Sequence, residues 1–331
     1  MVIDPVINLR GSNNVTATFV VEARSSFAPR DAQLLMAGLS RPLRSLAGLP
    51  VLVVAPWLSA RAQELLRTEE VSYIDLTGNA WVRAAHPPLF ISSTGAARNP
   101  QPVSRAPVRL RGAKAGRLVR ALVDITPPYG VGDLARTTGL NPGYVSRLLE
   151  ALDREALVDR AGRGVVTAVD YLALVARWTE TYRLFDSNAV SRYIAADGAA
   201  KVLAGLRSAG LPGRVVVTGS FAAVRQAPVA APVLLAAYAQ EPAALAGALG
   251  LLPADEGANV ILLGPFDPVV WERTEADDAI TYAAPSQVAA DCLTGAGRMP
   301  AEGQALLAWM GENEDRWRAA SLAALTPDAS R

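Results

Sequence analysis

Residues 131–164 read VGDLARTTGLNPGYVSRLLEALDREALVDRAGRG, and this stretch decides how the middle of the chain folds. Asn141 is a good N-cap, and Pro142 suits the first helical position because its missing N–H costs nothing there. Ala156 stands where such helices often end in a Gly with positive φ, which costs up to about 1 kcal/mol if the left-handed cap is kept. The pattern predicts a helix over residues 141–155. Its buried face repeats at three, four and seven positions: Val145, Leu148, Leu149 and Leu152.

The residues on either side complete a helix-turn-helix followed by a hairpin. Leu134 and Ala135 supply the buried side of a shorter helix, and Gly139 fits the tight turn between the two helices. After the second helix, residues 157–169 alternate like two strands around the turn at residues 161–164. The order predicts a winged helix-turn-helix, with the hairpin as its wing.

A winged helix of this order is typical of proteins that read double-stranded DNA. Its second helix enters the major groove with its N-terminal residues at base edges. Arg147 can form a bidentate pair with guanine, and Tyr144 can reach a base or a phosphate. Arg160 and Arg163 on the wing can touch phosphates or the minor groove. The alternative is a winged helix used for protein contacts or dimerisation. The expected DNA contacts are Lys114, Arg117, Asn141, Gly143, Tyr144, Ser146, Arg147, Arg160 and Arg163.

Charge is distributed unevenly along a chain whose net charge is only +1. Residues 1–75 carry 7 basic and 7 acidic residues, whereas residues 76–164 carry 13 basic and 6 acidic residues, a net charge of +7. Residues 165–331 carry 12 basic and 18 acidic residues, a net charge of −6. The basic block favours phosphate binding and counterion release. The alternative for its N-terminal part is a solvated basic linker.

Length and composition indicate several packed domains. The 331 residues are 51% hydrophobic and 19% charged, which excludes wholesale disorder and is expected of two or three domains. Residues 93–108 are rich in Pro and small residues and are interpreted as a linker. The expected α/β multidomain architecture has an α/β domain at 1–95, a winged helix-turn-helix at 108–170, and a connecting helix with an α/β domain at 171–331.

Residue counts make several classes of site improbable. Cys292 is the only cysteine and His86 the only histidine, so a disulfide framework, a thiolate zinc site and a Ser-His-Asp triad are not expected. No cofactor and no metal are expected. Residues 1–10 lack the apolar core of a signal peptide, and every apolar run is interrupted before it reaches the length of a membrane span. We therefore expect a cytoplasmic, nucleoid-associated protein with no membrane contact.

The N-terminal domain alternates strands with helices, which predicts an α/β layered sandwich. Asp75, Gly78 and Asn79 are interpreted as a hairpin turn rather than a site. Strands are expected at residues 17–23, 51–55, 73–76, 80–82 and 89–91, and helices at residues 29–47 and 59–67.

The segments VVEAR, PVLVVAPWLSARAQELL and YIDLTGNAWV, which lie within residues 20–82, resemble the domain attached to winged helices in bacterial regulators of the AbiEi antitoxin-like group. Its layout is similar to the PD-(D/E)xK (restriction-endonuclease-like) nuclease fold, whose Glu-x-Lys strand, with an upstream Asp, binds Mg²⁺ and activates water. Here the strand reads Glu22-Ala23-Arg24, and an arginine cannot be deprotonated as a catalytic lysine can. We expect a degenerate nuclease scaffold in which Glu22 and Arg24 form an ion pair or Arg24 touches phosphate. A Mg²⁺-dependent nuclease centred on Glu22 is the alternative.

The C-terminal domain is also expected to be α/β. Its TGSFAA segment, residues 218–223, resembles the C-terminal part of the same regulators, which is similar to a nucleotidyltransferase scaffold with Gly-Ser after its first strand. Such chemistry needs acids on the next strand, and none occurs between Gly219 and Gln240. We therefore expect a degenerate module for sensing, dimerisation or partner binding, with a small-molecule effector or a protein as its partner. Strands are expected at residues 214–218, 233–237 and 260–263, and helices at residues 170–185, 242–249, 285–293 and 301–309.

These patterns together predict a sequence-specific, non-enzymatic transcriptional regulator that binds double-stranded DNA as a homodimer. Its recognition helix is expected at residues 141–155 and its wing at residues 157–169. Besides the nuclease, a second alternative is the antitoxin of a toxin–antitoxin pair that regulates its own synthesis through the winged helix.

Overall fold

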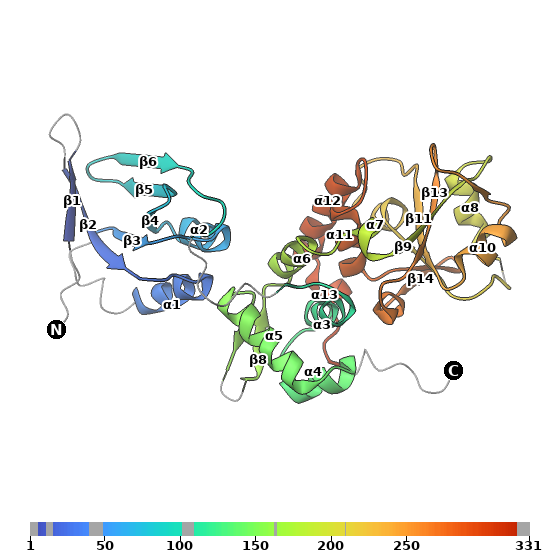
Figure 1. The fold of residues 1–331 in the computed structure, drawn as a ribbon, viewed down its shortest axis with the longest axis horizontal. Helices are drawn as coiled ribbons and strands as arrows, with labels where there is room; N and C mark the ends of the chain where they lie inside the picture. The colour runs from blue at the N-terminus through green and yellow to red at the C-terminus, as the bar shows by residue number, and fades with distance from the viewer. Residues whose placement is uncertain are drawn as a thin grey trace. The chain divides into compact units, whose positions relative to one another are not determined.

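The computed structural model describes residues 6–10, 16–39, 49–100, 109–161, 164–208 and 210–322 of a mixed α/β protein (Figure 1). The chain divides into two compact units. Unit 1 is Met1–Pro107 with Leu149–Ala156, and unit 2 is Val108–Leu148 with Leu157–Arg331. The break at Pro107 falls inside the expected linker. The three-domain division stays a prediction, because unit 2 combines residues 108–148 with the whole C-terminal part.

Unit 1 is built on one six-stranded sheet with the strand order β1-β2-β3-β4-β5-β6. Strands β2, β3 and β4 run parallel to one another, and the remaining neighbours are antiparallel. Helices α1 (Pro29–Leu39) and α2 (Ala60–Thr68) make the two crossovers between the parallel strands. The rest of the helix expected to reach residue 47 lies outside the described residues. The strands are β1 (Val6–Arg10), β2 (Thr16–Ala23), β3 (Val51–Ala55), β4 (Ser72–Asp75), β5 (Ala80–Ala84) and β6 (Leu89–Ser93).

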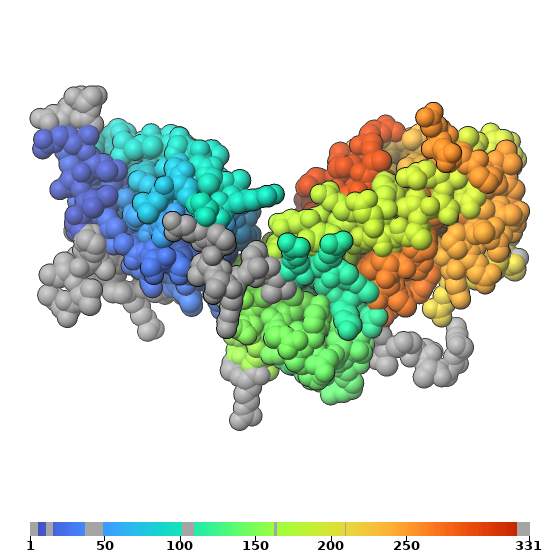
Figure 2. All heavy atoms as spheres, viewed as in Figure 1, coloured from blue at the N-terminus to red at the C-terminus, as the bar shows by residue number. Residues whose placement is uncertain are grey.

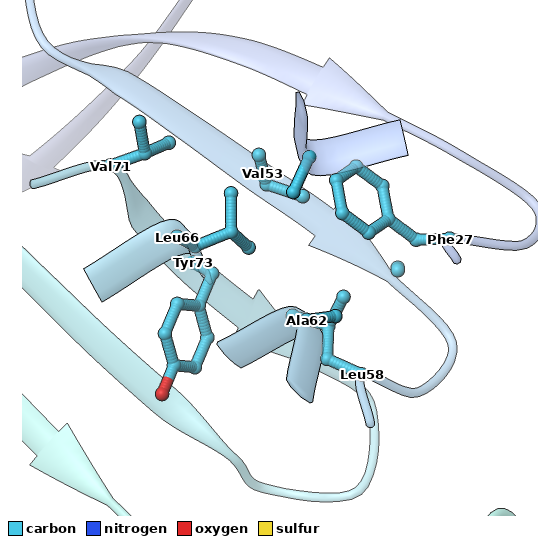
Figure 3. Close-up of a cluster of buried hydrophobic side chains, with 9 residues drawn as sticks. Phe27, Val53, Leu58, Ala62, Leu66, Val71 and Tyr73 are labelled. Carbon is cyan, nitrogen blue, oxygen red and sulfur yellow. The ribbon is translucent and has the colours of Figure 1, made fainter. Parts of the chain in front are cut away.

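The apolar run of β3 buries side chains on both faces of this sheet. Val53 points to the side of α1 and α2, where it packs with Phe27, Leu66 and Tyr73 (Figure 3). Leu52, the preceding residue, points to the other side and packs in a second cluster. A strand buried on both faces is what a continuous apolar run predicts. This confirms the expected β3 and places it at the centre of unit 1.

A buried carboxylate organises the turn between β4 and β5. Asp75 is 2% exposed and accepts hydrogen bonds from the backbone nitrogens of Leu58, Thr77 and Asn79 at 2.8–3.0 Å. It also accepts from the Thr77 hydroxyl at 2.7 Å and from the Asn79 amide at 2.8 Å. The interpretation of Asp75 and Asn79 as turn residues is confirmed, since the carboxylate serves the backbone of two loops.

The middle of the chain forms three helices followed by a two-stranded hairpin. Helix α3 is an addition to the expected elements, and α4 and α5 occupy the expected positions on either side of Gly139, whose φ is +65°. An isolated bridge joins Tyr129 to Val166, so the segment before α4 lies against the hairpin. The elements are α3 (Ala113–Asp124), α4 (Val131–Thr138), α5 (Pro142–Arg154), β7 (Val158–Arg160) and β8 (Val166–Val169).

Helix α5 begins and ends as its local sequence predicts. The side-chain oxygen of Asn141 accepts from the backbone nitrogen of Gly143 at 2.9 Å, which is the expected N-cap. Ala156 has a φ of +54°, so the left-handed cap is kept without a glycine, at a cost of up to about 1 kcal/mol. The expected apolar face is confirmed, since all four of its residues are at most 3% exposed: Val145, Leu148, Leu149 and Leu152.

The C-terminal part of unit 2 is a seven-stranded mixed sheet with the strand order β12-β9-β13-β11-β10-β15-β14. At its centre β11 pairs antiparallel to β10 and parallel to β13, and β10 pairs parallel to β15. Strands β10, β11 and β13 confirm the expected strands. The strands are β9 (Ala189–Ile194), β10 (Val215–Thr218), β11 (Leu235–Ala239), β12 (Leu252–Pro253), β13 (Val260–Gly264), β14 (Glu275–Asp277) and β15 (Ile280–Tyr282).

Helices cover both faces of this sheet. Helices α8 and α10 lie on one side of it, and α11 and α12 lie on the other (Figure 1). One expectation is wrong: the single helix at residues 170–185 is two, α6 and α7, because Thr181 and Tyr182 turn inward to hydrogen-bond the carbonyl of Leu110 and the side chain of Asp291. The remaining helices are α6 (Tyr171–Thr179), α7 (Leu184–Ser187), α8 (Ala199–Gly205), α9 (Ser220–Ala223), α10 (Pro242–Ala248), η3 (Pro268–Trp271), α11 (Pro285–Leu293), α12 (Met299–Glu312) and α13 (Glu314–Trp317).

None of the helices in the described part of the chain has the length and apolar character needed to cross a membrane.

The Asp75 turn makes the stability of unit 1 depend on pH. Burial raises the pKa of Asp75, but the hydrogen bonds from Thr77, Asn79 and Leu58 lower it by more, so its pKa lies below the ordinary value. The carboxylate therefore stabilises the fold above the unfolded-state pKa of about 3.9. That contribution is lost as the pH falls through the lower folded-state pKa.

We expect Asp75→Asn to lower the free energy of unfolding by about 2 kcal/mol at pH 7, since the charge-assisted hydrogen bonds are lost. The difference from the unchanged protein should shrink below about pH 4. Urea unfolding of the full chain at both pH values measures this. Glu64→Gln, which changes an exposed carboxylate on α2, is the control and should shift stability by less than about 0.5 kcal/mol. Unchanged stability of Asp75→Asn at pH 7 would contradict the assignment.

Candidate nucleic-acid interface

The N-terminal half of α5 carries five of the residues expected to contact DNA. Asn141 and Gly143 are exposed, and Arg147, one turn later, is exposed as well. Tyr144 and Ser146 are half-buried. Burial raises the pKa of the Tyr144 phenol. The five residues thus lie together on the first two turns of one helix.

The guanidinium of Arg147 lies over the first turn of α5. A Cβ built on Gly143 would come within 3.6 Å of a terminal nitrogen of Arg147 and within 3.1 Å of the side-chain oxygen of Asn141. Long side chains on a helix lean toward its N-terminus, which explains this position. In the described part of the chain no acidic residue pairs with Arg147. Its planar set of donors is therefore available at the end of the helix whose dipole is positive.

The two basic residues expected on α3 differ in their surroundings. Lys114, near the start of α3, is exposed. Arg117 instead donates to both carboxylate oxygens of Asp267, at 2.6 and 3.2 Å, and to the carbonyl of Thr138 at 3.0 Å. Because its guanidinium is held within unit 2, we leave Arg117 out of the interface and retain Lys114.

On the hairpin, Arg160 is half-buried and lies over the turn. A Cβ on Gly164 would meet a terminal nitrogen of Arg160 at 2.7 Å, so the glycine leaves room for the guanidinium. The Nε atom of Arg160 is buried without a hydrogen-bond partner among the described atoms. Arg163 lies outside the described residues. The structure thus places one of the two wing arginines and says nothing of the other.

A buried ion pair within α3 is satisfied by residues of the C-terminal part of unit 2. Arg120 and Asp124, one turn apart, are each 1% exposed, and their nearest nitrogen and oxygen lie 2.9 Å apart. Arg120 also donates to the side-chain oxygen of Gln287 at 2.9 Å and to the carbonyl of Glu272 at 3.2 Å. Asp124 also accepts from the hydroxyl of Ser286. Since an unpaired buried charge is very costly, these contacts fix α3 against the start of α11.

Gln287 extends this network into the sheet. Its amide nitrogen donates to Asp291 at 2.8 Å, while its oxygen accepts from Arg120. Burial raises the pKa of Asp291, whose carboxylate is fully enclosed. Hydrogen bonds therefore lead without a break from α3 to strands β10 and β11. The other donors to Asp291 are the hydroxyls of Thr218 at 2.5 Å, Tyr182 at 2.7 Å and Tyr238 at 2.8 Å.

The C-terminal end of α3 is capped by Arg318, which lies near the last described residues. Arg318 donates to the carbonyls of Val123 at 2.9 Å and Ile125 at 2.7 Å. These groups lack intrahelical partners, and a cation suits the negative end of the helix dipole. The same guanidinium lies 4.6 Å from the ring centre of Tyr171. Figure 2 shows the teal and green residues of α3 and its neighbours adjoining the later segments of unit 2, and α3 contacts α6, α11 and η3.

The buried network was missed at the sequence level because its polar residues come from distant segments. Arg120 and Asp124 are four positions apart, which signals an ion pair on a helix, but nothing local signals that the pair is buried. Their partner Gln287 sits between the buried residues Ser286 and Val288. A polar residue inside an apolar helical run is the available signal there.

Glu22 and Arg24 form an ion pair, which is one of the two expected arrangements of these residues. Their side chains meet at 2.5 Å near the end of β2. Among the described residues, no group of three or more His, Cys, Asp or Glu side chains is placed to hold a metal ion. The described residues of unit 1 therefore do not bring together the several oxygen ligands that a Mg²⁺ site of the nuclease type needs.

The Gly219-Ser220 turn after β10 is also internally satisfied. Gly219 has a φ of +65°, and the Ser220 hydroxyl donates to the buried carboxylate of Glu302 on α12 at 2.5 Å. This acid comes from a helix near the C-terminus rather than from the next strand. The turn is thus held by α12, and the acids that a nucleotidyltransferase carries on its second strand are absent from the described strand β11.

Comparison with family models, with curated proteins and with solved structures finds no match to this chain. The resemblance to the AbiEi antitoxin-like group stays a prediction.

Loss of Arg120 should destabilise unit 2 strongly. We expect Arg120→Ala to lower the free energy of unfolding by about 3–5 kcal/mol, because Asp124 keeps a buried charge without its partner. Arg24→Ala, which removes an arginine from a pair that is 55% exposed on the arginine side, is the matched control and should cost less than about 1 kcal/mol. Urea unfolding of the full chain compares the two. Equal costs would show that the α3 pair is not buried as described.

The ion pair at Glu22 leads us to expect no DNA cleavage. Plasmid DNA incubated with the full chain and Mg²⁺ or Mn²⁺ should remain intact, with Glu22→Ala as the control. Cleavage by the unchanged protein that disappears in Glu22→Ala would reverse this conclusion and make Glu22 a metal ligand.

Proposed function

We propose that this protein is a sequence-specific regulator of transcription that binds double-stranded DNA through α5 and the β7–β8 hairpin. The order α3, α4, α5 and hairpin fits a winged helix-turn-helix, with α5 entering the major groove. The observation that carries the proposal is the exposed, unpaired Arg147 over the first turn of α5, on the side opposite the buried apolar face.

Each residue of the first two turns has a separate role in this proposal. Arg147 reads a base, because its fork of donors matches the two acceptors of guanine in the major groove. Gly143 has no side chain, so the helix backbone can approach the groove closely at this position. Asn141 spends its oxygen on the N-cap and therefore fixes the start of the helix rather than reading sequence. Tyr144 supplies a hydroxyl for a base or a phosphate.

Phosphate contacts come from residues around α5. Lys114 is exposed near the start of α3. Arg160, on the hairpin, reaches the backbone or the minor groove, and the sequence predicts the same for Arg163. Such contacts position the protein and make binding salt-dependent without selecting sequence. The acidic C-terminal part, by contrast, is suited to contacts other than DNA.

The remaining parts serve as scaffolds that position this interface. The parallel β2–β4 core with crossovers α1 and α2 suits a restriction-endonuclease-like domain that has lost its metal ligands. The C-terminal sheet suits a sensing or dimerising module that takes a small-molecule effector or a protein partner. We propose a homodimer, because a single winged helix buries little surface and two-fold operators match two-fold proteins.

Duplexes selected from a random-sequence library test the proposal and supply the operator. We expect Arg147→Ala to weaken binding of the selected duplex by about 1–3 kcal/mol and to relax preference at one base position. The matched control is Arg154→Ala, an exposed arginine at the other end of α5, which should leave base preference unchanged. Arg163→Ala should weaken all duplexes alike and reduce the salt dependence of binding.

Two results would overturn the proposal. One is failure of the full chain to select any duplex. The other is an unchanged base preference in Arg147→Ala, which would show that α5 does not read the major groove.

A further inference from the structure

Arg117 links three parts of unit 2 that are far apart in sequence. Its guanidinium makes a two-pronged contact with Asp267 and donates to the carbonyl of Thr138, the last residue of α4. Gly139 follows, and α5 begins three residues later at Pro142. The side chain therefore connects the loop after β13 to the turn that leads directly into α5.

The carboxylate at the other end of this contact is itself fixed. Asp267 is 3% exposed. Its Oδ1 accepts a hydrogen bond from the backbone nitrogen of Val269 at 2.9 Å, and this contact caps the start of the 3-10 helix η3. The neighbouring Phe266 donates its backbone N–H to the side chain of Asn188 at 2.8 Å. Asp267 thus belongs to a rigid corner of the C-terminal sheet, and Arg117 is anchored to it.

The surface of α3 is shaped for this corner. A Cβ on Gly116 would come within 2.8 Å of the ring of Phe266 and 3.2 Å of the ring of Trp178. The residue before Arg117 must therefore be a glycine for α3 to lie this close to the loop. One turn later, Arg120 donates to the carbonyl of Glu272 at the end of η3. The corner at residues 266–272 is consequently held at two successive levels of α3.

We propose that Arg117 is a positioning residue that couples the C-terminal sheet to the DNA-reading helix, and that it makes no contact with phosphate. The inference rests on the proposed function, since it states how α5 is held for DNA binding. All three guanidinium nitrogens already have acceptors, and the charge is neutralised by a buried carboxylate. The hydrogen bonds that Arg117 donates to Asp267 raise the pKa of its guanidinium, as expected of an arginine paired with a carboxylate. Displacement of the Asp267 corner would therefore move the turn before α5.

A double-mutant cycle on the selected duplex separates positioning from phosphate contact. If Arg117 positions α5, Arg117→Ala and Asp267→Asn each weaken binding about fivefold or more. The double variant then binds the duplex no more weakly than the single variant with the lower affinity, because both changes break the same link. The slope of log affinity against log salt stays the same in all three.

A phosphate contact gives the opposite pattern. Arg117→Ala would then reduce the salt slope by about one, and Asp267→Asn, which removes a negative charge, would leave affinity unchanged or raise it. Either result overturns the inference. Lys114→Ala is the matched control on α3. Loss of its exposed ammonium should reduce the salt slope, and its effect on affinity should add to that of Asp267→Asn instead of overlapping with it.

Hydrogen exchange of the free protein tests the link without DNA. Arg117→Ala and Asp267→Asn should both speed amide exchange at residues 138–147, and Lys114→Ala should not. Asp267→Asn keeps the size of the side chain and an oxygen for Val269, so it preserves the fold. Unchanged exchange at these residues in both variants overturns the inference. If the full chain selects no duplex yet exchange rises as expected, the proposed function fails while the link stands.

Discussion

The buried pair of Arg120 and Asp124 is the constraint on which the rest of unit 2 depends. Both charges lie on α3 and are enclosed, so the residues that satisfy them must stay where they are. Those residues, Ser286 and Gln287, begin the helix that packs on the central strands of the C-terminal sheet. Helix α3 is therefore as much a part of that sheet domain as of the helix and hairpin segment that follows it.

This sharing changes the meaning of the basic charge around α3. The sequence holds a net charge of +7 over residues 76–164, but Arg117 and Arg120 spend their charges on internal carboxylates. Fewer cations therefore remain for a polyanion than the net charge suggests. The proposed interface consequently depends on the placement of Lys114 near the start of α3, Arg147 over the first turn of α5 and Arg160 on the hairpin. A change in the C-terminal sheet would reach that placement through α3.

Local signals predicted the elements that local forces stabilise. Helix α5 has its own cap and apolar period, and even the unfavourable left-handed cap at Ala156 was foreseeable from the sequence. Helix α3 was not predicted, although Ala115, Leu118, Val119 and Leu122 follow a helical period and are buried. The basic block that contains it was interpreted as favouring phosphate binding, and Arg117 was assigned to DNA for that reason. Arg117 and Arg120 contact partners 150 or more positions away in the sequence, and the spacing of neighbouring residues does not reveal such partners.

The central claim is that the DNA-reading surface is the first half of α5 with the hairpin, held by α3, while both sheets remain scaffolds. Hydrogen exchange of the full chain with and without its selected duplex measures this most directly. The account predicts that bound DNA slows amide exchange at residues 139–148 and 158–169. Protection confined to unit 1 around Glu22, or to the C-terminal sheet, with residues 139–148 unaffected, would contradict it.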